Sequence, residues 1–139
     1  MTQLTVADVE YLASRLAKRY GDGVAGEPAL PVRSPNVLES CVVTPFQRFA
    51  GRPLYPSLLT KASVLFYFMI KNRPFPANNR RIAIGTLLVF LSLNGKWLRA
   101  DTPELFSFAL WVAQSPADFK EQVVDAVKKF IQKHLVDLE

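Results

Sequence analysis

The residues best suited to chemistry lie in one basic stretch, from Lys71 to Arg81. Asn79, Arg80 and Arg81 fall in the first turn of a predicted helix, where backbone amides without helical partners and the helix dipole favour an anion. Two guanidinium groups at that point make a phosphate site physically reasonable. Cations at a helix N-terminus cost about 0.3–1 kcal/mol each, and a bound anion would offset that cost. The alternative is that both arginines pair with local carboxylates or point into water.

Four other side chains of chemical interest have simpler interpretations. Cys41 lies among apolar residues with no histidine near it in sequence, so it is interpreted as a buried structural thiol. His134 is the only histidine, so a histidine-based catalytic site elsewhere in the chain is excluded. We expect His134 on the surface of the last helix. Trp97 and Trp111 are not interleaved with basic residues as in an RNA-stacking platform, so we expect them to pack in the core or at an interface. No residue is assigned as a metal ligand.

The composition predicts one folded domain over residues 1–139. Half of the residues are hydrophobic and 21% are charged, which excludes an intrinsically disordered chain. A single cysteine and the lack of a leader sequence predict a cytoplasmic location. The longest apolar run has about 12 residues, too few to cross a membrane, so no membrane contact is expected. The formal net charge of +5 permits binding of nucleic acid, nucleotide phosphates or an acidic protein.

Caps and prolines predict the elements that must position the basic stretch. We expect an all-α, compact bundle of about six helices, with approximate bounds 5–20, 35–46, 57–72, 78–94, 103–114 and 116–135. The third and fourth helices are almost wholly apolar and are therefore placed at the centre of the bundle. The segment from Arg73 to Ala77 contains two prolines, so it predicts a rigid loop between these two helices.

Smaller features add to this architecture. Asn78 is expected to cap the fourth helix, and Gly85 is expected to allow close contact with another helix. Residues 96–99 could pair as a short edge strand. Four apolar residues of the loop before the third helix are expected to attach it to the core: Phe46, Phe49, Leu54 and Tyr55.

The order of these elements and the letters NRPFPANNRRIAIGTLLVFLSLNG resemble the Fic/Doc family. In that family a helix, a loop of the form His-Pro-Phe-x-(Asp/Glu)-(Gly/Ala)-Asn-(Lys/Arg)-Arg and a hydrophobic helix ending in Asn-Gly follow one another. The upstream segments LTVADVEYLASRL and LYPSLLTKASVLFYFMIKN resemble the opening helix and the helix before the motif in the death-on-curing (Doc) branch. The similarity covers most of the chain from Leu4 to Gly95, and it implies the all-helical fold of that family.

The resemblance assigns roles to individual residues of the motif. It implies that Phe75 anchors the loop in the core and that Asn79, Arg80 and Arg81 hold nucleotide phosphates. The family's catalytic histidine falls on Arg73, which has no acceptor and stays protonated, so Arg73 could bind an anion but could not act as a general base. The family's acidic magnesium ligand falls on Ala77, which offers no oxygen to a cation, and the small residue after it is Asn78.

The function implied is that of a Doc-like protein with a degenerate motif, related to the toxins of toxin–antitoxin modules. Active members of the family transfer a phosphoryl or nucleotidyl group from a nucleoside triphosphate to a protein hydroxyl, and the Doc branch resembles a kinase of a translation elongation factor. The alternative is an active transferase whose base and metal come from elsewhere, such as the substrate. A nucleic-acid binder is disfavoured because the helix after the loop is apolar. ATP or another nucleotide is the expected ligand, magnesium has no evident ligand, and a cognate antitoxin or another acidic protein is the expected partner.

Overall fold

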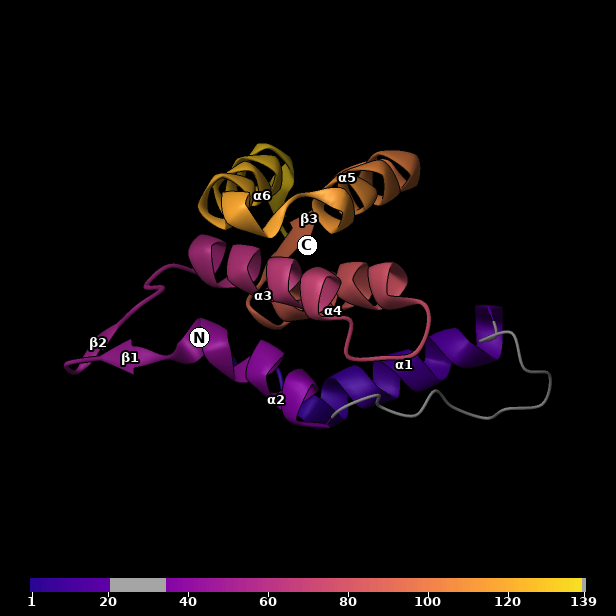
Figure 1. The fold of residues 1–139 in the computed structure, drawn as a ribbon, viewed down its shortest axis with the longest axis horizontal. Helices are drawn as coiled ribbons and strands as arrows, with labels where there is room; N and C mark the ends of the chain where they lie inside the picture. The colour runs from indigo at the N-terminus through magenta and orange to yellow at the C-terminus, as the bar shows by residue number, and fades with distance from the viewer. Residues whose placement is uncertain (21–34, 139) are drawn as a thin grey trace.

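The computed structural model describes residues 1–20 and 35–138, which form an all-α fold as the sequence predicts. The helices lie in three layers, with α3 and α4 in the middle, α1 and α2 on one side, and α5 and α6 on the other (Figure 1). The bounds of the six described α-helices are α1 Val6–Tyr20, α2 Pro35–Val43, α3 Leu58–Asn72, α4 Asn79–Leu93, α5 Thr102–Gln114 and α6 Lys120–His134. Within the described ranges, none of these helices has both the length and the hydropathy that crossing a bilayer requires.

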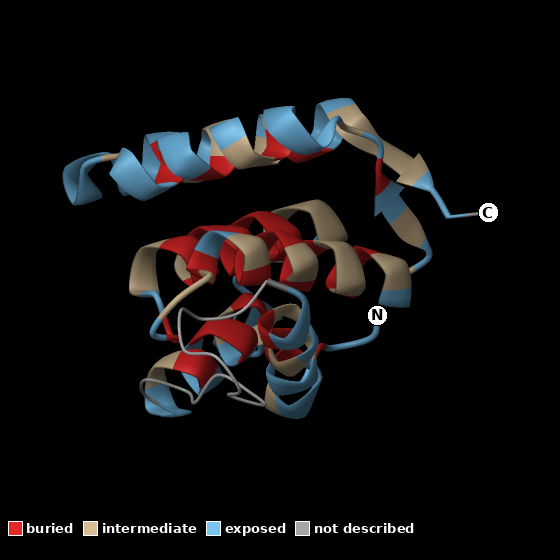
Figure 2. Ribbon diagram, turned by 90° about the vertical axis from the view of Figure 1, so that its right-hand side faces the viewer, coloured by how far each residue is buried: buried red, intermediate tan, exposed pale blue. Residues whose placement is uncertain are grey.

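The central layer is the apolar helix pair that the sequence predicts. Helix α3 begins with a capping box, in which Thr60 N donates to Ser57 Oγ (3.0 Å) and Ser57 N donates to Thr60 Oγ1 (3.2 Å). Buried residues gather on α3 and α4 and on the faces of the outer helices that turn toward them (Figure 2). The core therefore fixes both ends of the loop that joins the two central helices.

Gly85 allows the close helix contact that the sequence predicts. A Cβ atom built on Gly85 of α4 would lie 2.8 Å from Leu12 Cδ2 of α1, closer than carbon atoms pack. Glycine at this position lets α1 approach the central layer.

Four short strands form two antiparallel ribbons within the described residues. The first pairs β1 (Arg48–Phe49) with β2 (Arg52–Pro53), and the second pairs β3 (Lys96–Leu98) with β4 (Leu135–Asp137). The second ribbon confirms the predicted strand at residues 96–99 and supplies its partner. Leu135, predicted as the end of the last helix, instead starts β4 and pairs with Leu98, because this strand takes over the backbone hydrogen bonds where α6 stops.

Helix starts differ from the sequence-based expectations by a few residues. A 3₁₀ turn, Ala117–Phe119, precedes α6, and Asp101 stands at the cap position of α5. The turn Thr44–Phe46 likewise continues α2 to the predicted end at Phe46. The sequence also predicts a helix stop at residues 21–23, an irregular connection at residues 25–34 and a helix cap at Ser34, and these three predictions lie outside the described residues.

The loop before α3 is attached to the core differently from the prediction. Phe49 is 75% exposed and Leu54 is 49% exposed, because Ala50 and Gly51 (φ 52° and 78°) make a tight turn that carries β1 and β2 away from the bundle (Figure 1). Phe46 does reach the core, where its ring meets Phe90 edge to face with centroids 6.0 Å apart.

A buried lysine holds the base of this hairpin. Lys61 of α3 donates from Nζ to Pro45 O (3.0 Å) and to Tyr55 O (2.5 Å), and the ammonium lies 4.7 Å from the centroid of the Phe46 ring. Burial, with a smaller contribution from the charge of Arg48, lowers the pKa of Lys61 from its ordinary value. The side chain of Lys61 therefore joins the segments before β1 and after β2 to the central layer.

Candidate functional site

The loop between α3 and α4 begins and ends in a left-handed backbone conformation. Arg73 caps the C-terminus of α3 at φ 46° and ψ 64°, and Asn78 stands before α4 at φ 62° and ψ 24°. Between them Pro74 and Phe75 are buried, and Phe75 is only 1% exposed. The loop thus turns back into the core at Phe75 and presents Arg73 at its outer end.

The side chain of Asn79 closes the loop. Its Oδ1 accepts from Phe75 N (3.0 Å) and its Nδ2 donates to Phe75 O (2.7 Å), and all of these groups are buried. Asn78 stands at the cap position of α4, as expected, but its side chain makes no capping hydrogen bond with the helix amides. Its Oδ1 accepts from Arg81 Nη1 at 3.2 Å. Any contact of Asn79 with an anion would therefore use its backbone amide.

These residues line a cleft of about 500 Å³ at the junction of α3 and α4. The sequence-derived candidates Arg73, Asn79, Arg80 and Arg81 all contribute to its wall. The other lining residues are Ile70, Lys71, Ala77, Asn78, Phe106 and Ala113. The cleft therefore gathers four cationic side chains, and none of its described lining residues is acidic or a histidine.

Sequence reasoning gave no role to Lys71, Phe106 and Ala113. Lys71 belongs to the same basic stretch as the arginines, which was the available signal. Phe106 and Ala113 are seven residues apart on α5 and so share one helix face, but nothing local indicates that this face meets the loop. They add an apolar contribution from α5 to the lining of the cleft.

Lys71 fixes the C-terminal end of α5 beside the cleft. Its Nζ donates to Ser115 O (2.5 Å) and lies 3.5 Å from Ala113 O and from Ser115 Oγ. A cation at the carbonyl end of a helix is stabilised by the helix dipole. These partners are carbonyl oxygens and a hydroxyl, so Lys71 is a cationic side chain of the cleft wall that is not paired with an acid by these contacts.

The arginines differ in exposure and partners. Arg73 and Arg80 are exposed, and within residues 1–20 and 35–138 neither lies within ion-pair distance of a carboxylate. Arg81 is half-buried and donates to Asn78 Oδ1. The sequence left open that Arg80 and Arg81 pair with local carboxylates or point into water. Pairing is not observed for Arg80 within the described residues, and its exposure fits a side chain that points into water. The cleft can bind an anion, but its side chains include neither a general base nor a hard-cation ligand of carboxylate type.

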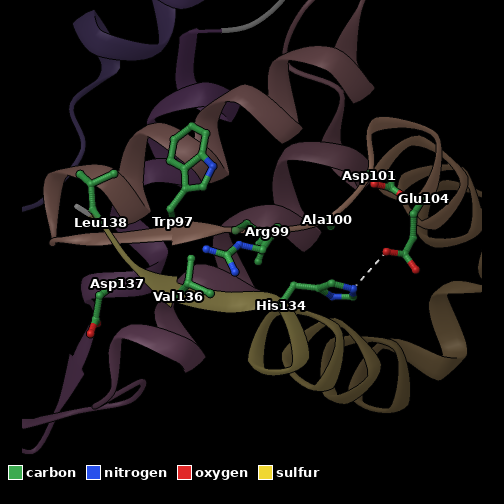
Figure 3. A pocket seen from close by; sticks show the side chains of 10 residues that line it. Trp97, Arg99, Ala100, Asp101, Glu104, His134, Val136, Asp137 and Leu138 are labelled. Carbon is green, nitrogen blue, oxygen red and sulfur yellow. Dashed lines mark ion pairs between the residues drawn. The ribbon is translucent and has the colours of Figure 1, made fainter.

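The only histidine lies in a different cleft, of about 630 Å³, formed by the β3–β4 ribbon and the start of α5 (Figure 3). His134 Nε2 lies 3.0 Å from Glu104 Oε1, and its Nδ1 lies 2.9 Å from Phe130 O. The predicted surface position is wrong, because this ion pair draws the imidazole between α5 and α6 and leaves its side chain 12% exposed. The two clefts share no lining residue, so His134 is not part of the cationic cleft.

The remaining candidates have structural roles. Cys41 is buried, and burial raises the pKa of its thiol to about 11 even though the Asn72 amide, 3.9 Å away, partly offsets the shift. The interpretation of Cys41 as a buried thiol is confirmed. Trp97 and Trp111 are 40% and 49% exposed, so neither is a core residue, and Trp111 stacks on Phe108 with centroids 5.7 Å apart.

Comparison with known proteins agrees with this architecture. A family model for the Fic/DOC family matches residues 3–91, which run from before α1 to near the end of α4 and include the loop with its cationic cleft. A search of curated proteins gives no match. Within the described residues no group of three or more histidine, cysteine or acidic side chains is placed to hold a metal ion. Because the matched residues make up well over half of the chain, this protein belongs to the Fic/DOC family.

Proposed function

We propose that this chain is a Doc-like pseudoenzyme, related to the toxins of toxin–antitoxin modules, that binds the phosphate groups of a nucleotide without transferring them. One observation carries the proposal: the cleft beside the motif loop is lined by Lys71, Arg73, Arg80 and Arg81 and by no acidic side chain among the described residues. Four cationic side chains with no acidic residue among the described lining favour an anionic ligand, and guanidinium groups suit phosphate oxygens because they donate in pairs.

The backbone supports the same ligand. The first helical hydrogen bond of α4 runs from Ile82 N to Asn78 O (2.9 Å), so the amides of residues 79–81 precede it. These amides and the helix dipole add partial positive charge at the end of the helix where the arginines lie. An anion there would offset the cost of placing two cations in the first turn.

Transfer chemistry is expected to be weak. The resemblance places Arg73 where the family has its general base, a role worth about 10²–10⁴ in rate, and arginine cannot accept the proton. It places Ala77 where the family has its acidic magnesium ligand, although phosphoryl transfer depends on metal ions to neutralise developing charge. Binding can persist without either group because the phosphate contacts come from other residues.

Titration calorimetry with ADP tests the binding. The wild-type protein should bind, and Arg80→Gln should weaken binding at least tenfold because it removes an exposed guanidinium from the cleft. Arg99→Gln is the matched control, since Arg99 is an exposed arginine that lines the other cleft. At ADP a hundredfold above Kd, the bound ligand adds about 2.7 kcal/mol to the free energy of unfolding, a rise of about 9 °C in Tm for 139 residues. Equal weakening by both substitutions would point to diffuse charge and would refute the site.

A label-transfer assay separates the pseudoenzyme from the active transferase. The protein is incubated with labelled ATP, magnesium, an elongation factor and cell lysate, and no protein should acquire label. Transfer that disappears in Arg81→Ala would establish the active Doc-type transferase instead. The double substitution Arg73→His with Ala77→Asp supplies a base and a carboxylate at the two family positions and serves as the gain-of-function comparison.

We also propose an acidic protein partner, such as a cognate antitoxin, because the chain carries a net charge of +5. The product of the neighbouring reading frame is the partner to test. Co-expression should yield a complex that survives size-exclusion chromatography, and separate elution of the two proteins would refute this assignment.

A further inference from the structure

The described lining residues of the cleft offer few side-chain oxygen atoms to a divalent cation. Asn78 and Asn79 carry the side-chain oxygens among its described lining residues. Asn78 Oδ1 accepts from Arg81 Nη1 (3.2 Å), and Asn79 Oδ1 accepts from Phe75 N (3.0 Å). Hard cations such as Mg²⁺ bind through carboxylate, carbonyl and water oxygens, so these engaged amides are poor ligands.

The surrounding charge opposes a cation as well. Arg73 and Arg80 are exposed at the cleft, Arg81 is half-buried beside them, and Lys71 is held at the end of α5 by Ser115 O. A metal ion bound to the ligand's phosphates would meet this positive field, and none of the described lining residues supplies a carboxylate to offset it. It would also neutralise the phosphate charge to which the arginines are attracted.

We infer that the cleft takes its polyphosphate ligand as the metal-free anion, and that Mg²⁺ competes with the protein for that ligand. This inference rests on the proposed function, since it specifies the form of the ligand in the same cleft. Members of the family that transfer phosphate use magnesium, whereas here magnesium acts as an antagonist of binding.

Coulomb's law sets the size of the effect. In water-like surroundings one charge pair about 4 Å apart changes a binding constant about fivefold. Mg²⁺ cancels two charges of a diphosphate, and at least one of them should face a guanidinium in the cleft. Binding of the magnesium complex should therefore be at least about fivefold weaker than binding of the free anion.

Calorimetric titration with pyrophosphate and with ADP, each in EDTA and in excess MgCl₂ at matched ionic strength, tests the inference. Matching the ionic strength removes the general screening that any salt would cause. The expected result is a Kd at least about fivefold lower in EDTA for both ligands. Pyrophosphate lacks a base and ribose, so the same ratio for both ligands assigns the effect to the phosphates.

Ala77→Asp is the diagnostic variant. Ala77 lines the cleft and is only partly buried, so a carboxylate there adds the oxygen ligand that the wall lacks. The variant should bind ADP more weakly in EDTA, and MgCl₂ should strengthen its binding instead of weakening it. Its melting curve in the absence of ligand establishes that it is folded, and Arg99→Gln should keep the magnesium response of the wild type.

The outcomes separate the inference from the function on which it rests. If the wild type binds equally well or more tightly with Mg²⁺, the metal-free ligand is refuted and the nucleotide-binding pseudoenzyme stands. If neither ligand binds under either condition, the proposed function is refuted and the inference with it. A folded Ala77→Asp protein that keeps the wild-type response to Mg²⁺ would also contradict the inference.

Discussion

Replacing Asn79 with alanine should destabilise the protein through the loop and not through the helix. The substitution removes both hydrogen bonds to the backbone of Phe75, at 3.0 Å and 2.7 Å, and leaves a buried N–H and a buried C=O without those partners. Each unsatisfied buried group costs about 1–3 kcal/mol, so the free energy of unfolding should fall by about 2–6 kcal/mol. An entropy of unfolding of about 2.1 cal/mol/K per residue over 139 residues converts this loss into a fall of about 7–21 °C in Tm.

Differential scanning calorimetry of Asn79→Ala provides the measurement, with Asn36→Ala as the matched control. Asn36 is exposed in the first turn of α2, so its replacement should change stability by no more than about 0.5 kcal/mol. Asn79→Asp should not restore the wild-type Tm, because one carboxylate oxygen can still accept from Phe75 N but the other would face Phe75 O, which is also an acceptor. Equal melting temperatures for the two alanine variants would refute the view that Asn79 holds the loop.

Three further predictions concern residues that do not line the cleft. Gly85→Ala should raise the Tm by about 2–3 °C in a Leu12→Ala background and by less in the wild type, because alanine is the better helix former but its Cβ must displace Leu12 Cδ2, 2.8 Å away, when that side chain is present. Cys41, with a pKa of about 11 and a buried sulfur, should react with a thiol reagent at pH 8 only after denaturation, and rapid labelling of the folded protein would contradict its burial. Because burial and Arg48 lower the pKa of Lys61, the folded state binds that proton less tightly than the unfolded state. The stability of the wild type relative to Lys61→Met should therefore rise as the pH approaches the ordinary lysine pKa of 10.5 from below, and a flat difference in Tm would refute this.

Local signals in the sequence predicted the bounds of the two central helices and the loop between them. The capping residue Ser57 and the stop at Asn94–Gly95 bound the central helix pair, because caps and positive-φ glycines act within a few residues. Prolines at 74 and 76 likewise predicted the loop. The predicted strand at residues 96–99 was correct, but its partner β4 was not found, since pairing across about 40 residues leaves no local trace.

The site was predictable only in part, for the same reason. The basic stretch identified Arg73, Arg80 and Arg81, and the structure places all three on one cleft. The apolar contribution from α5 depends on long-range packing, so Phe106 and Ala113 carry no signal in the sequence around them. The sequence did not reveal that the side chain of Asn79 turns into the loop. Asparagine suits both a helix cap and the closure of a loop, and Asn78 and Asn79 are neighbours, so the residue type does not tell which of them has which role.

The residues that hold the conformation of the loop are not those at the family's catalytic positions, and the left-handed backbone at the ends of the loop bears on this. Arginine at φ 46° carries a backbone cost of about 1–2 kcal/mol, whereas histidine, asparagine and glycine occupy this region more readily. The loop keeps its course through the buried Phe75 and through Asn79, the first residue of α4, whose side chain bonds the backbone of Phe75. The side chains at positions 73 and 77 can therefore be exchanged while the loop backbone stays the same. Evolution, or a protein engineer, can exchange them without rebuilding the backbone, and histidine at position 73 would be easier for the backbone to accommodate than the arginine now there.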